Sequence, residues 1–167
     1  MDDPSHPPIP WPGLRAGQAF VLPLQAGRMA TPFGECFEAD GVRLRPKAEF
    51  HVTVLSRDMA RLAAGLGEAA LRTLYEALSW MPRRTGRYAL LRSVKPAEDG
   101  TLECWSLIEH LDLPAMIDFR AGLARNLGPA FAAPVPHVTH FVHGDPHGIG
   151  VPDARALAAL QVREVTP

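Results

Sequence analysis

The chain has 167 residues, of which 47% are hydrophobic, and a formal net charge of −1. This length suits one domain, and this hydrophobic content supports a packed core and argues against wholesale disorder. The cations are 15 Arg and 2 Lys, set against 18 acidic residues. That balance excludes a protein that coats long nucleic acid by charge alone, because such binding needs many phosphate contacts.

The N-terminal residues and the two cysteines are typical of a protein that stays in the cytoplasm. The first residues are acidic and lack a signal-peptide pattern, and no apolar run approaches the ~20 residues that span a bilayer. Cys36 and Cys104 are too few and too isolated for a disulfide framework or a zinc knuckle, so we expect both thiols to be buried like small apolar side chains. We therefore expect a soluble cytoplasmic protein with no membrane contact.

Residues 1–17 are interpreted as a proline-rich N-terminal arm, and residues 18–167 as a single domain of two lobes. Proline fixes φ and lacks an N–H donor, so residues 4–12 are expected to be extended. The simplest interpretation is that the arm pins Trp11 onto the body of the protein. The alternative is that the arm docks a proline-recognising partner.

The first part of this domain predicts two strands and an interrupted helix. Residues 19–24 form a short apolar strand, placed at a sheet edge by Pro23. Residues 50–55 form a clearer strand, because apolar and polar side chains alternate along it. Ser56 is suited to cap the helix that follows, and that helix is expected to break near Gly65 before a second helical run.

The second part predicts four strands around one long helix. Strands at 87–94 and 102–111 are joined by loop residues 95–100. Pro114 suits the first turn of the helix, and Gly128 suits its end. Three segments then follow: an inner strand at 138–142, a glycine- and proline-rich loop at 144–152 and a closing strand at 160–165. Hairpin-paired strands with helices on one side indicate the α+β class.

The tripeptide His-Val-Thr occurs twice, at residues 51–53 and 137–139. Both copies fall inside predicted strands, and they lie about half the chain length apart. This spacing suggests two similar lobes that each contribute one strand to a shared surface. A single His-x-Thr in a strand is usually structural, but two copies with apolar flanks favour a functional pair.

Strand geometry determines which side chains of each motif point together. Residues two apart share one face of a strand, with Cα atoms about 6.6 Å apart. His51 and Thr53 therefore project together, and so do His137 and Thr139. The same alternation predicts that Val138, His140 and Val142 take the opposite face, where a histidine is unusual.

Two imidazoles and two hydroxyls suit phosphodiester chemistry without a metal. A neutral imidazole takes a proton from the attacking water or hydroxyl, and a protonated imidazole gives one to the leaving oxygen. Threonine hydroxyls donate hydrogen bonds to the non-bridging phosphate oxygens and stabilise the charge of the transition state.

These motifs resemble those of the 2H phosphoesterase superfamily, which includes LigT-like RNA cyclic phosphodiesterases and is marked by a pair of His-Φ-Thr-Φ motifs, where Φ is apolar. The first motif, His51 to Val54, matches this pattern fully. The second departs from it, since His140 replaces the final apolar residue. Pro136 and the helix predicted from Pro114 to Leu127 are also similar to the family.

The resemblance implies a bilobal, pseudo-symmetric fold in which two antiparallel sheets form a central cleft with helices outside. It also implies hydrolysis of a cyclic phosphodiester, such as the 2′,3′-cyclic phosphate of a nucleoside or an RNA end, with no cofactor. Its catalytic residues are carried over to His51 and His137, and its phosphate-binding residues to Thr53 and Thr139.

Three other residues are candidates for substrate binding. Tyr88 and Arg92 share one face of a predicted strand, where a ring stacks a base and a guanidinium pairs with phosphate. A solvated strand face is the alternative. His143 and His147 are expected near the mouth of the groove, and His110 is expected at the surface. The spacing of the histidines from His137 onward does not suit zinc, because strand alternation separates them.

A non-catalytic nucleotide- or phosphate-binding module on the same fold is the alternative function, because a fold can outlive its chemistry.

Overall fold

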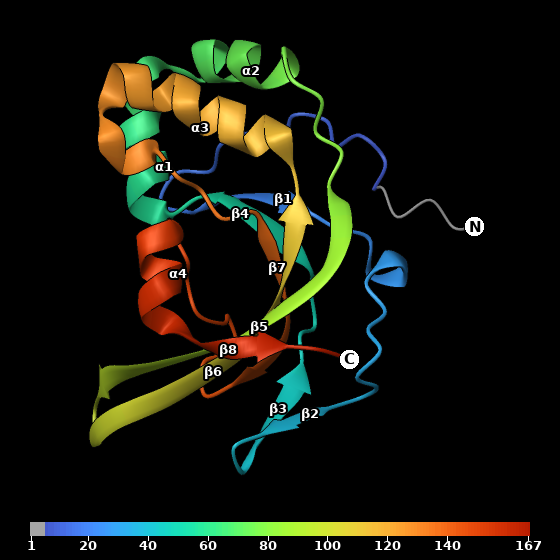
Figure 1. Cartoon of the computed structure of the whole chain (residues 1–167). Coiled ribbons are helices and arrows are strands. Elements are labelled where there is room, and N and C mark those ends of the chain that lie inside the picture. The colour runs from blue at the N-terminus through green and yellow to red at the C-terminus, as the bar shows by residue number, and fades with distance from the viewer. Residues whose placement is uncertain (1–5) are drawn as a thin grey trace.

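A computed structural model of the chain describes residues 6–167, so the first five residues of the predicted arm lie outside the described residues. The fold is α+β, as predicted (Figure 1). In chain order its elements are β1 (Phe20–Pro23), η1 (Ala26–Arg28), β2 (Phe37–Ala39), β3 (Val42–Pro46), β4 (His51–Leu55), α1 (Arg57–Ala63), η2 (Ala64–Leu66), α2 (Glu68–Glu76), β5 (Arg83–Ala97), β6 (Gly100–Asp112), α3 (Pro114–Leu127), η3 (Pro129–Phe131), β7 (His137–His143), α4 (Ala154–Leu160) and β8 (Gln161–Val165).

The strands form two antiparallel sheets of unequal size. The larger sheet has the order β2-β3-β7-β6-β5-β8, and the smaller one pairs β1 with β4. The first His-Val-Thr motif therefore belongs to a two-stranded sheet, and the second to an inner strand of a six-stranded sheet. Figure 1 shows α1, α2 and α3 together at one end of the molecule, with the long β5–β6 hairpin extending toward the other.

The largest hydrophobic core lies between the smaller sheet and these three helices. The strand β4 contributes Val52 and Val54, which are fully buried and alternate with its half-buried polar residues. Phe119 and Leu123 of α3 face the same core. The alternation that predicted β4 thus arises because only one face of the strand meets this core.

The N-terminal arm is anchored to the body, as the simplest interpretation predicted. The Ile9 N–H donates to the carbonyl of Trp80 at 2.9 Å, and the Tyr75 hydroxyl donates to the carbonyl of Ile9 at 2.7 Å. The ring of Trp11 lies 5.2 Å from the rings of both Phe20 and Tyr75. The arm from Ile9 to Trp11 is therefore bound to the rest of the same molecule by backbone hydrogen bonds and ring contacts.

The predicted helix boundaries are confirmed by their caps. The Ser56 hydroxyl accepts a hydrogen bond from the Met59 N–H at the start of α1. Gly67, with φ of 86°, separates α2 from the preceding turn. Pro114 opens α3, and Gly128, with φ of 106°, follows its last residue.

Some segments differ from the sequence-based expectation. The strands β5 and β6 continue through most of the predicted loop at 95–100, because cross-strand pairing reaches Ala97 and Gly100. The hairpin of β2 and β3 was not predicted, although Asp40 and Gly41 both have positive φ, as a tight hairpin turn requires. The helix α4, capped by Asp153, was also missed.

Cys36 and Cys104 are both free thiols; Cys104 is buried as expected, whereas Cys36 is half-buried. Within residues 6–167, no helix is both long enough and apolar enough to cross a bilayer.

A β-bulge in β7 changes which side chains share a face. Thr139 pairs with Ile108 and Phe141 pairs with Leu107, so His140 is an extra residue on its strand. After the bulge the side chains alternate again, but each position now faces the opposite side from the one that uninterrupted alternation would give. Val142 therefore returns to the face of Thr139, and the prediction that it shares the face of Val138 is wrong.

We predict that Gly144→Ala destabilises the protein by roughly 1–3 kcal/mol. Gly144 follows β7 with φ of 85°, and a Cβ there would lie 2.5 Å from the carbonyl oxygen of Glu103. Gly65→Ala is the matched control, because its Cβ would meet nothing within 4 Å and its φ is not positive. Urea unfolding measures both, and equal midpoints would contradict the prediction.

Candidate active site

The two His-Val-Thr motifs meet at one cavity of about 390 Å³, here named the motif cavity. It is lined by His51 and Thr53 from β4 and by His137 and Thr139 from β7. The strands β4 and β7 lie against each other, although they belong to different sheets. The four residues singled out from the sequence are thus brought together around one space.

The motif valines explain why the four polar side chains point into this cavity. Val52 and Val138, the central residues of the two motifs, are each 0% exposed. Both pack into the largest core, so the pleat directs the residues on either side of them away from it. In each sheet, therefore, a buried valine directs the neighbouring histidine and threonine into the motif cavity.

The rest of the cavity wall comes from four further segments. These are β1 with the residue before it, the connection between β3 and β4, one residue of α3, and the loop at 144–152. Their cavity-lining residues include Ala19, Val21, Lys47, Glu49, Arg120, His147, Gly148, Ile149, Gly150, Val151 and Pro152.

The imidazole of His137 is held in one tautomer. Its Nδ1 lies 2.6 Å from the carbonyl oxygen of Val135. Since a carbonyl only accepts, Nδ1 carries the proton, and in the neutral ring Nε2 keeps its lone pair. Burial lowers the pKa of His137, and the neighbouring His110 and His51 lower it further, against the opposing effect of the bond to Val135.

His51 has a more open environment. Its side chain is half-buried. Burial lowers its pKa, as do the nearby Lys47 and His147, whereas Glu49 at the cavity rim raises it. The two motif histidines are therefore unlike: His137 is enclosed, whereas His51 is half-buried and Glu49 opposes part of the lowering of its pKa.

A buried guanidinium lies at the wall of the motif cavity. Arg120 of α3 is only 2% exposed, and it makes no ion pair within the described part of the chain. Its N–H groups donate to backbone carbonyls instead, at 2.6 Å to Phe131, 3.1 Å to Pro152 and 3.4 Å to Val54. Burial lowers its pKa, but an arginine stays charged in proteins.

The loop at 144–152 is fastened as a fixed wall of the cavity. Lys47 Nζ donates to the carbonyls of Pro146 and His147 at 3.1 and 3.3 Å. The Ile149 N–H donates to the Ser106 hydroxyl at 3.0 Å. Beside it, Gly148 comes so close to Thr139 that a Cβ would lie 3.3 Å from the threonine methyl carbon.

The structure does not bring Tyr88, Arg92 and His143 to the motif cavity, whose lining includes none of them. Tyr88 lies opposite Glu109 on the other face of the large sheet, here named the rear face, and Arg92 shares that face. Arg92 pairs with Glu103. His143 follows the bulge and so lies opposite Trp105 on the rear face as well.

Three residues near the cavity were missed or misplaced by the sequence. His110 is half-buried rather than at the surface, and it is the cross-strand partner of His137. Arg120 lies beside Phe119 in the buried stripe of α3 that includes Met116 and Leu123. This was a usable signal, since a charge on an apolar stripe calls for buried partners. Lys47 lies outside both motifs, whereas His147 lines the cavity as expected.

Comparisons of the chain with protein-family models, with curated proteins and with solved structures gave no match.

We predict that Arg120→Met destabilises the protein by about 3 kcal/mol, because it leaves several buried carbonyls without their donors. Arg125→Met, an exposed substitution later in the same helix, is the matched control and should cost about 0.5 kcal/mol or less. Chemical denaturation followed by fluorescence compares the two variants. Similar losses would contradict the anchoring role of Arg120.

We predict that the free energy of unfolding falls as the pH is lowered through 6.5, the ordinary pKa of histidine. The pKa values of His51, His110 and His137 are all lowered in the folded state. The unfolded chain therefore binds protons that the folded chain does not, so acid favours unfolding. Urea midpoints above and below this pH measure the slope, and His137→Gln should reduce it. A slope unaffected by this substitution would contradict the prediction.

Proposed function

We propose that this chain is a metal-independent phosphodiesterase that hydrolyses a cyclic phosphodiester, the 2′,3′-cyclic phosphate of a nucleoside or of an RNA end. The observation that carries the proposal is the convergence of His51, Thr53, His137 and Thr139 on one cavity. The resemblance of both motifs to the 2H phosphoesterases supports it, as does a cleft between two antiparallel sheets with helices outside.

The proposed base is His137. Its Nδ1–H bond to Val135 leaves Nε2 as the nitrogen with a free lone pair, and burial favours its neutral form. The ring then takes a proton from the attacking water, whose oxygen forms the new bond to phosphorus.

The proposed acid is His51, because its ring is only half-buried and Glu49 opposes part of the lowering of its pKa by burial, Lys47 and His147. Its proton passes to the ester oxygen whose bond to phosphorus breaks, which opens the cyclic phosphate. When two side chains of the same type serve as acid and base, their different environments usually decide which role each takes.

The charge of the phosphate is met from two directions in this proposal. The Thr53 and Thr139 hydroxyls donate to its non-bridging oxygens, where negative charge builds up in the transition state. The buried Arg120 and the half-buried Lys47 add positive potential at the cavity wall. A small nucleotide or the terminal nucleotide of an RNA suits a cavity of about 390 Å³.

We predict that His51→Ala and His137→Ala each lower kcat by about 10²- to 10⁴-fold, and that Thr53→Ala and Thr139→Ala each lower it by about 10²- to 10³-fold. Turnover of the four nucleoside 2′,3′-cyclic phosphates should persist in EDTA and follow a bell-shaped pH profile. His143→Ala, on the rear face, is the control and should retain full activity.

Loss of turnover in EDTA would overturn the proposed mechanism. Full activity of both histidine variants would do the same. If the wild-type protein binds these nucleotides by calorimetry but turns over none of them, the non-catalytic binding module is the better description.

A further inference from the structure

A second histidine of β7, at the last position of the second His-Φ-Thr-Φ motif, occupies an unusual place. His140 is the extra residue of the β-bulge, directly after Thr139. Its side chain is 1% exposed and points to the rear face, between the rings of Phe50 at 5.7 Å and Tyr88 at 5.9 Å. Its backbone carbonyl accepts from the Lys47 N–H at 2.8 Å. The bulge thus touches two residues that line the motif cavity.

The His140 side chain is held by a buried carboxylate. Its Nε2 lies 2.8 Å from Oε2 of Glu109 on β6, and Glu109 is 0% exposed. Burial raises the pKa of Glu109, but hydrogen bonds from His140 and Arg84 outweigh this and hold the pKa below its ordinary value. An ionised carboxylate only accepts, so the His140 Nε2 carries the proton.

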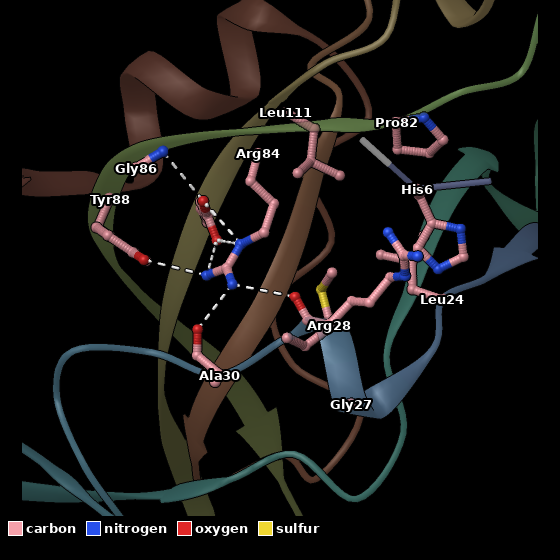
Figure 2. A pocket seen from close by; sticks show the side chains of 12 residues that line it. His6, Leu24, Gly27, Arg28, Ala30, Pro82, Arg84, Gly86, Tyr88 and Leu111 are labelled. Atoms are coloured by element: carbon pink, nitrogen blue, oxygen red, sulfur yellow. Dashed lines mark hydrogen bonds and ion pairs between the residues drawn. The ribbon is translucent and has the colours of Figure 1, made fainter. Parts of the chain in front are cut away.

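The carboxylate of Glu109 is in turn held by β5. Arg84 donates to it from two nitrogens, at 2.8 and 3.0 Å, and the Gly86 N–H donates at 3.0 Å. Figure 2 shows Arg84 reaching onward from this carboxylate to Tyr88 and to backbone oxygens of the segment around Ala30. Arg84, Glu109 and His140, here named the Glu109 network, therefore link three neighbouring strands.

Burying this network costs more free energy than an apolar core would at the same place. The Nδ1 of His140 is buried and has no hydrogen-bond partner among the described residues. An apolar side chain at this position, as in the resembled motif, would avoid both the unpaired nitrogen and the desolvation of the pair. Buried polar pairs are best attested as devices that fix a register, and a register choice exists here.

The register decides which side chains reach the motif cavity. Side chains alternate with a period of two, so moving or deleting the bulge would turn part of β7 over. His137 and Thr139 before the bulge face the cavity, while Phe141 after it packs into the rear core. Both requirements are met only when the extra residue lies at 140.

We propose that His140 is a positioning residue: its bond to Glu109 fixes the bulge and thereby the placement of His137 and Thr139 in the motif cavity. The effect on catalysis rests on the proposed function, whereas the effect on placement does not. His140 acts through its neighbours in the strand and touches no reacting atom.

The test compares three substitutions at one position. His140→Gln keeps an N–H donor near the place of Nε2, His140→Asn is shorter and withdraws it, and His140→Val removes it. Because small misplacements of catalytic groups cost up to about 100-fold, we expect kcat to fall about 10- to 100-fold in the Asn and Val variants, with KM changed less than about threefold. His140→Gln should recover most of kcat.

A measurement on the resting protein separates this proposal from the proposed function. The imidazole ¹⁵N resonances of His137 and the amide resonance of Thr139 should shift in the Asn and Val variants and return toward wild type in the Gln variant. Arg163→Gln, which breaks the exposed pair with Asp40, is the control and should shift neither.

Unshifted resonances in folded His140→Asn or His140→Val would overturn the positioning role, and so would full kcat in either variant. Equal loss in the Gln and Asn variants would also overturn it, since only the donor position distinguishes them. If the wild-type protein shows no turnover, the proposed function fails, and the resonances still decide the positioning role. If His140→Val does not fold, the Gln and Asn pair still decides.

Discussion

One buried guanidinium joins the segments that enclose the motif cavity. Arg120 donates to carbonyls of β4, of the chain after η3 and of the loop at 144–152. Arg120 makes no ion pair within residues 6–167, and burying such a cation costs several kcal/mol. Hydrogen bonds to backbone carbonyls offset this cost at about 1.5–3 kcal/mol each. The guanidinium that ties β4 to the loop also lines the motif cavity, so the side chain that supports the wall is part of the wall.

The large sheet has different chemistry on its two faces, and the bulge at His140 makes this possible. The strand β7 must supply polar groups to the motif cavity and apolar groups to two cores within seven residues. Strict alternation of side chains cannot meet both demands, because Thr139 and Phe141 would then lie on the same face. One inserted residue resolves the conflict, and the Glu109 network supplies a partner for the polar side chain that this places inside.

The features that the sequence predicted are those set by neighbours along the chain. Alternation marked β4, and Ser56, Pro114 and Gly128 marked helix ends, because capping and pleating act within a few residues. The bulge depends on Glu109, which lies 31 residues before His140 in the chain, so local alternation placed His143 on the wrong face. Tyr88 and Arg92 share one face of their strand, as predicted. Which face of that strand meets the motif cavity, however, depends on how distant strands pack.

The unequal sheets give two identical tripeptides different electrostatics. β7 lies between β3 and β6, and its His137 is buried with a backbone carbonyl fixing the ring. Among the described strands, β4 pairs with β1 alone, and its His51 is half-buried, with Glu49 opposing part of the lowering of its pKa by burial. Proton transfer at a phosphodiester needs one group that takes a proton and one that gives it. Two equally placed histidines would offer the proposed reaction no such difference, whereas here one ring is enclosed and the other is half-buried, because their strands occupy different places in their sheets.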